Sequence, residues 1–92
     1  MTSAIPLRAE TFDDLHASLV DLARGRREAL AQVYDGTAEP ALRLALARTR
    51  GDRVSAEQLL CRVYVEVRRR AAEYPTSGMR ALPWVLGVAA RA

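Results

Sequence analysis

The stretch Ser55–Tyr74, SAEQLLCRVYVEVRRRAAEY, decides the fold of this chain. Apolar residues recur in it at steps of three and four, which is the period of one face of an α-helix. The members of this stripe are Ala56, Leu59, Leu60, Val63, Val67, Ala71 and Tyr74. Cys61, Tyr64 and Val65 widen the apolar arc, so the helix is expected to pack against neighbours on more than one side. The pattern predicts the central helix of a small bundle, with its core along this stripe.

The polar residues of the same stretch also favour a helix. Ser55 is a favourable N-cap, and Gln58 three residues later would complete a capping box. Pairs of opposite charge at i,i+4 each stabilise a helix by about 0.2–0.5 kcal/mol. Three such pairs are expected here: Arg62–Glu66, Glu66–Arg70 and Arg69–Glu73. The apolar stripe is therefore expected to hold the fold, while the charged face stays available for a partner or for water.

Size and composition predict one globular, intracellular domain. The chain has 92 residues, half of them hydrophobic, which favours a folded domain over a disordered one. Its single cysteine, Cys61, excludes an internal disulfide and has no metal-ligand pattern around it. The start of the chain has no apolar signal segment, and no apolar run approaches the roughly 20 residues of a membrane span. These features predict a protein of the reducing cytoplasm without a membrane partner.

The charge is unevenly distributed along the chain. Residues 1–46 hold five Arg and seven acidic residues, whereas residues 47–92 hold nine Arg and four acidic residues, and there is no Lys. Planar guanidinium groups suit phosphates and carboxylates. A basic second half therefore indicates nucleic acid or another polyanion as partner. A solvated, arginine-biased surface without a ligand is the alternative interpretation.

The rest of the chain predicts further helices and no strand. Residues 1–10 are expected to form a flexible N-terminal arm, and residues 11–92 a helical domain whose first helix is capped by Thr11. A second helix is expected over residues 26–35, with Tyr34 inward, and Pro40 either starts a new helix or kinks a continuous one. A break at residues 75–78 precedes a last helix that begins near Arg80 to Leu82. The fold class is therefore all-α, a bundle of four to five helices.

No constellation of residues typical of an enzyme is present. The chain lacks a Ser–His–Asp set in motif context, a glycine-rich phosphate loop and a paired-carboxylate pattern. The only histidine, His16, flanks the inner stripe of the first helix and has no second ligand nearby, so a boundary position is favoured over a site. The sequence thus predicts no enzyme, no cofactor, no metal and no small-molecule substrate.

The order of the segments adds a resemblance to a known family. The segments are LARGRREALAQVYD, a GDR turn, AEQLLCRVYVEVRRRAAEY, a Pro/Ser/Gly loop and RALPWVLGVAARA. Over about residues 20–91 this arrangement resembles region 2 of the extracytoplasmic-function (ECF) sigma factors of bacterial RNA polymerase. The strongest part is the central helix together with the run Ala81, Leu82, Trp84, Leu86 and Ala89.

The resemblance implies two kinds of contact. In that family the central helix binds the clamp helices of the large subunit of core RNA polymerase. Here it would do so through Gln58, Cys61, Arg62, Val65 and Arg68. The following loop and helix capture the melted single strand of the promoter's Pribnow box, here through Ser77, Gly78, Arg80, Trp84 and Arg91. Arginines suit phosphates, and an aromatic ring suits a flipped base. For Trp84 a position in the core is the alternative interpretation.

The central helix also departs from the family. Its members usually carry an Asp-x-x-Gln-Glu motif, and the aligned residues here are Gln58, Cys61 and Arg62, so two acids are replaced and one cation is added. This departure keeps a second hypothesis open: a degenerate sigma-like domain that binds an anti-sigma factor or a second copy, without promoter activity. An unrelated helical interaction module is the third.

Overall fold

The protein is a bundle of four α-helices, seen in a computed structural model that describes the backbone of residues 7–92 and the side chains from Asp14 onward. The helices are α1 (Leu7–Ala23), α2 (Ala29–Arg48), α3 (Arg53–Arg70) and α4 (Ala81–Arg91), with a 3₁₀ turn η1 (Ala71–Glu73) after α3. This part of the chain contains no strand, so the all-α prediction is confirmed. None of its helices combines the length and hydropathy that crossing a bilayer requires.

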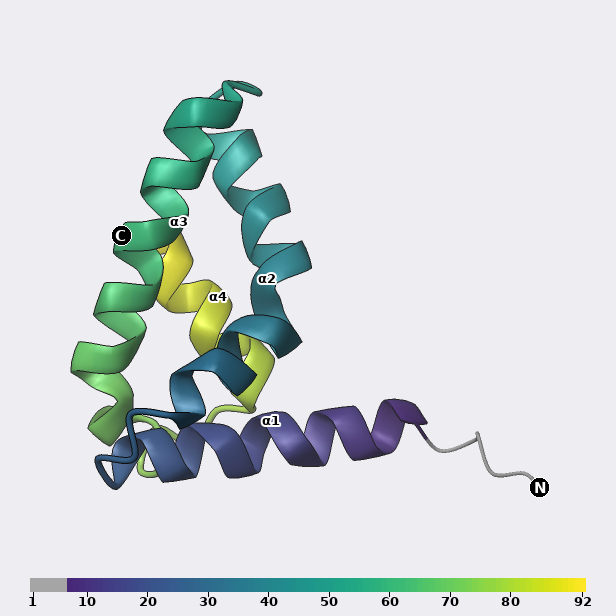
Figure 1. Cartoon of the computed structure of the whole chain (residues 1–92), viewed down its shortest axis with the longest axis vertical. Helices are drawn as coiled ribbons and strands as arrows, with labels where there is room; N and C mark the ends of the chain where they lie inside the picture. Colours follow the sequence, from purple (N-terminus) through teal and green to yellow (C-terminus); the bar gives the residue numbers. More distant parts are fainter. Residues whose placement is uncertain (1–6) are drawn as a thin grey trace.

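The helices α2 and α3 rise side by side from α1, which lies across their lower ends, and α4 lies against both (Figure 1). The apolar stripe of α3 faces inward, as predicted, because residues three and four apart share one side of a helix. Its buried members are Ala56, Leu59, Leu60, Val63 and Val67. Leu15 and Leu19 of α1, Val33 of α2 and Val85 of α4 complete the core.

The helix α2 is continuous across Pro40, which settles the two alternatives that the sequence leaves open there. Proline has no backbone N–H, so it cannot donate the usual bond to the carbonyl of Gly36. Thr37 lies on the inner side of the same turn and is fully buried. Its hydroxyl donates to the Val33 carbonyl at 2.7 Å and contacts the Tyr64 hydroxyl of α3 at 2.5 Å. A side-chain network therefore ties the proline turn to α3.

Two predicted helix starts are wrong. The helix α1 begins at Leu7, four residues before Thr11, because residues 7–10 include strong helix formers. Of the predicted N-terminal arm, residues 1–6 lie outside the described residues. The helix α3 has Asp52 as its N-cap in place of Ser55: the Asp52 carboxylate accepts from the Ser55 backbone N–H at 3.4 Å and from the Ser55 hydroxyl at 2.9 Å. These hydrogen bonds lower the pKa of Asp52 below its ordinary value.

The three i,i+4 ion pairs predicted for α3 are also wrong, because Glu66 and Glu73 pair at i,i+3. Glu66 contacts Arg69 at 2.8 Å, and Glu73 contacts Arg70 at 3.0 Å. The helix ends at Arg70, and in the tighter 3₁₀ turn that follows, side chains three residues apart eclipse each other. Glu73 is thereby placed over Arg70, and its hydrogen bond and charge raise the pKa of Arg70. Arg62 is left without an acidic partner among the described residues.

Candidate interaction sites

The five residues predicted to bind polymerase lie together on the outer face of α3. Gln58, Cys61, Arg62, Val65 and Arg68 are all exposed. Val65 is unusual for an aliphatic side chain, with 61% of its surface exposed. Cys61 and Val65 form an apolar ridge, because they are four residues apart on one helix. Arg62 and Arg68 lie on the two sides of this ridge, and neither forms an ion pair within the described part of the chain.

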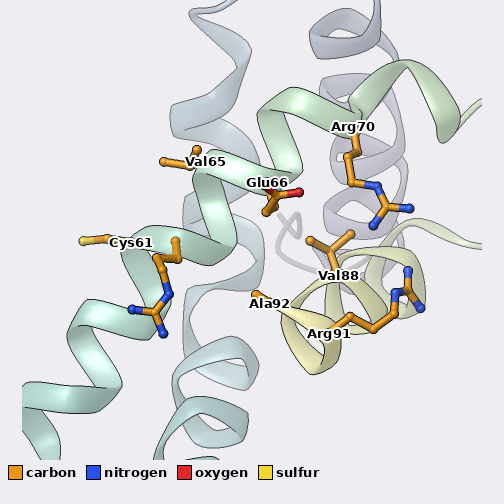
Figure 2. Close-up of a pocket in the computed structure, with 8 residues that line it drawn as sticks. Cys61, Val65, Glu66, Arg70, Val88, Arg91 and Ala92 are labelled. Atoms are coloured by element: carbon orange, nitrogen blue, oxygen red, sulfur yellow. The ribbon is translucent and has the colours of Figure 1, made fainter.

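A groove runs along each side of this ridge. The α3–α4 groove has a volume of about 490 Å³ and is lined by Cys61, Arg62, Val65, Glu66 and Arg70 of α3 with Val88, Arg91 and Ala92 from the end of the chain (Figure 2). The α2–α3 groove has a volume of about 510 Å³ and lies between the ridge and the residues Leu30, Tyr34 and Leu42 of α2. Cys61 and Val65 line both grooves, so the ridge is the shared wall.

Tyr34 is part of the α2–α3 groove and contradicts its predicted inward position. Its side chain is 44% exposed and packs edge-on against the ring of Tyr64, with centroids 4.9 Å apart. Val33 and Thr37, four residues apart on α2, face the core, so Tyr34, the residue after Val33, lies at the boundary. Tyr64 lies beneath it, and burial raises the pKa of the Tyr64 hydroxyl.

The predicted DNA-binding loop is ordered by its own hydrogen bonds. The Ser77 hydroxyl donates to the Tyr74 carbonyl at 2.7 Å and accepts from the Met79 backbone N–H at 3.1 Å. Gly78 adopts φ +74°, a conformation that glycine tolerates best. The Ser77 hydroxyl therefore donates its proton within the loop and cannot donate it to a ligand. Arg80, which immediately precedes α4, has an exposed side chain that can contact a ligand.

Trp84 is a core residue, in line with the alternative interpretation of the sequence. It is 6% exposed and packs edge-on against Tyr74, with ring centroids 5.7 Å apart. Tyr74 in turn contacts His16 of α1, whose Nδ1 lies 2.6 Å from the Tyr74 hydroxyl. The three rings anchor the start of α4 and the loop before it to α1. In this conformation Trp84 has almost no surface to offer to a base.

Arg91 lies apart from the other predicted DNA-binding residues. It is in the last turn of α4, whereas Arg80 immediately precedes the first. A helix of this length separates its ends by roughly 16 Å. The structure therefore brings Arg91 to the α3–α4 groove, beside Arg70 (Figure 2). It leaves Ser77, Gly78 and Arg80 at the other end of α4. The sequence could not reveal this division, because it depends on how α4 packs on α3.

Comparison with known proteins gives one similar curated protein. The ECF RNA polymerase sigma factor SigK of Mycobacterium ulcerans (strain Agy99) is 38% identical over 79 residues, which cover 86% of this chain and 42% of that protein. The chain thus spans less than half the length of this relative. No family model and no solved structure matches the chain. The chain is thus similar to part of an ECF sigma factor.

Proposed function

We propose that this chain is a sigma-factor region 2-like domain, which binds core RNA polymerase and captures the melted Pribnow box during transcription initiation. The observation that carries the proposal is the 38% identity to an ECF sigma factor over 86% of the chain. The proposal describes a cytoplasmic binding domain without enzymatic activity. The exposed faces that it requires are the outer face of α3 and the loop around Arg80.

The outer face of α3 is proposed to bind the clamp helices of the polymerase large subunit. An exposed apolar ridge between two grooves suits a helical partner, because a helix can seat its own apolar side chains on both sides of Val65. The surrounding polar residues, Gln58, Arg62 and Arg68, would form the rim of that interface.

The loop before α4 is proposed to hold single-stranded DNA through Arg80. A guanidinium group binds a phosphate in bidentate geometry, and the basic half of the chain attracts the strand. The buried ring of Trp84 would support the loop from beneath and would not stack on a base. Two or three phosphate contacts predict a log–log salt slope of about −1.5 to −2, at roughly 0.7 per phosphate for a single strand.

A pull-down of bacterial core RNA polymerase by the tagged chain tests the first contact. We expect retention of polymerase, release by an excess of an intact sigma factor, and loss of retention in Val65→Asp. Val54→Asp is the matched control, because Val54 is an equally exposed valine of α3, 65% exposed, outside both grooves. Absence of retention by a chain that circular dichroism shows to be folded would remove polymerase from the proposal.

Fluorescence anisotropy with a labelled Pribnow-box strand tests the second contact. Arg80→Ala is expected to weaken binding and to reduce the salt slope by about 0.7, the share of one phosphate. Arg43→Ala, which removes an exposed arginine of α2, serves as the control. Equal affinities of wild type and Arg80→Ala, or an affinity that does not change with salt concentration, would exclude this loop as the DNA-binding site.

The altered motif on α3 favours a second candidate, a sigma-like protein-interaction module without promoter activity. Arg62 is exposed, and from Asp14 onward no acid pairs with it, at a position where the resembled family has an acid. Like charges across an interface can cost several kcal/mol. The variant Gln58→Asp/Cys61→Gln/Arg62→Glu restores the family motif and should bind core polymerase at least about tenfold more tightly. If neither this folded variant nor wild type binds core polymerase, the second candidate replaces the first.

A further inference from the structure

We infer that the α3–α4 groove binds an amphipathic helix of a partner protein that carries carboxylates beside its apolar stripe. This inference deepens the second candidate, the protein-interaction module, and rests on it, because it names the chemistry of the partner. It concerns a groove that α4 helps to build, and it uses Arg91, which the sequence places with the DNA-binding residues (Figure 2).

The floor of the groove is apolar. Cys61 and Val65 contribute exposed side chains from α3, and Val88 and Ala92 close the groove on the side of α4. A partner that covers the exposed valine and the apolar surface beside it would gain about 25 cal/mol of binding free energy for each Å² of apolar surface removed from water. Apolar side chains of a partner would therefore supply most of the contact area.

The rim of the groove is positively charged, and its acids are already engaged. Arg62 and Arg91 have no acidic partner among the described residues, whereas Glu66 pairs with Arg69. Figure 2 shows the side chains of Arg70 and Arg91 on the same side of the groove. The Ala92 backbone oxygen accepts from Arg48 at 3.1 Å, so it is also engaged. The guanidinium groups of Arg62 and Arg91 can each bind a carboxylate of a partner, because a carboxylate accepts two parallel N–H···O bonds from one guanidinium group.

The apolar floor favours a protein helix over a nucleic acid strand, since a phosphate backbone requires cations along its path and gains little from valines. Charge disfavours a second copy as the occupant. Residues 53–73 carry five Arg and three Glu, so the outer faces of two copies would repel each other. An acidic amphipathic helix fits the groove best, because its apolar side chains can cover the apolar floor while its carboxylates pair with the arginines of the rim.

Two synthetic helical peptides test the inference. They share one leucine stripe, and one carries Glu where the other carries Lys beside that stripe. In fluorescence anisotropy with the whole chain, the Glu peptide should bind at least about tenfold more tightly than the Lys peptide, which corresponds to about 1.4 kcal/mol. Arg62→Gln/Arg91→Gln should abolish this preference. Arg24→Gln/Arg43→Gln, which removes two exposed arginines away from the groove, should preserve it.

Several outcomes would overturn the inference. Equal binding of both peptides, or an equal loss in the control pair, would show that the groove does not select carboxylates. A larger loss of affinity for a single-stranded oligonucleotide than for the Glu peptide in Arg62→Gln/Arg91→Gln would assign the groove to nucleic acid. Dimerisation of wild type in analytical ultracentrifugation that this variant abolishes would assign it to a second copy.

The polymerase pull-down separates this inference from the proposed function. A chain that retains polymerase but does not prefer the Glu peptide would reject the inference alone. A chain that prefers the Glu peptide but does not retain polymerase would reject only the proposed polymerase contact, and the acidic helix would then belong to another protein.

Discussion

Replacement of Thr37 by valine tests the network that joins the proline turn of α2 to α3. Thr37 is fully buried, and Tyr64 is 7% exposed. The Thr37 hydroxyl has one proton, which it donates to the Val33 carbonyl at 2.7 Å. The Tyr64 hydroxyl, 2.5 Å away, must therefore donate to Thr37. Thr37→Val removes the acceptor and leaves a buried donor without its partner.

The geometry sets the size of the effect. A buried polar group that loses its partner costs about 1–3 kcal/mol, so Thr37→Val should lower the free energy of unfolding by that amount. Tyr64→Phe removes the donor but leaves Thr37 bonded to Val33, so it should cost only about 0.5–1.5 kcal/mol. In the double variant Thr37→Val/Tyr64→Phe no buried donor lacks an acceptor. Its loss in free energy of unfolding should therefore be smaller than the sum of the losses in the two single variants, by at least about 0.5 kcal/mol.

Urea denaturation followed by circular dichroism measures these free energies, provided that the slope with denaturant stays constant. Thr49→Val is a matched control, because Thr49 makes the same kind of bond, to the Ala45 carbonyl at 2.8 Å, without a tyrosine partner. The reasoning is refuted if the costs of Thr37→Val and Tyr64→Phe add within about 0.3 kcal/mol. It is also refuted if Thr37→Val is no more costly than Thr49→Val.

Three further predictions concern the bundle. Leu60→Ala should cost about 2–5 kcal/mol in urea melts, whereas Val54→Ala, at an exposed position, should change stability by less than about 0.5 kcal/mol. Gly78→Ala should destabilise the loop by about 1–2 kcal/mol in the same assay, because a Cβ disfavours its positive φ. Asp52→Ala should lower the urea midpoint at neutral pH through loss of the cap. Because the folded Asp52 carboxyl has a lowered pKa, its contribution is complete above its unfolded pKa of about 3.9 and is lost as the pH falls through the lower folded pKa, so the two urea midpoints should begin to converge below about pH 4.

The core was the most predictable part of this molecule from its sequence. The stripe of α3 is buried as the 3.6-residue period requires, and the start of α4 follows from Pro83, which fits only the first turn of a helix. The exposure of Gln58 and Arg62 follows from the same period. These features depend on a single helix, and local spacing is enough to fix them. The widened apolar arc was wrong for Cys61 and Val65, which are exposed and contact no neighbouring helix closely enough to be buried.

Features that depend on neighbouring elements were not predictable in this way. The exposure of Tyr34 depends on how α2 packs against α3, and the pairing of Glu73 with Arg70 depends on the 3₁₀ turn at Ala71–Glu73. The two grooves exist only because α2 and α4 lie on opposite sides of the ridge. Arg80 and Arg91 are close in sequence, yet one helix length divides them between two sites.

The edge-on rings of Tyr74 and Trp84 at the start of α4 also give the chain an intrinsic optical probe. Trp84 is its only tryptophan, and the buried indole lies 5.7 Å from the ring of Tyr74. Light absorbed by Tyr74 should pass to the indole with high efficiency at this distance, and emission should shift to longer wavelength when α4 separates from α1. The Tyr74 backbone carbonyl accepts a hydrogen bond from the Ser77 hydroxyl, so a ligand that moves the adjacent loop should also change this signal. Folding and ligand capture can thus be followed in real time without a dye.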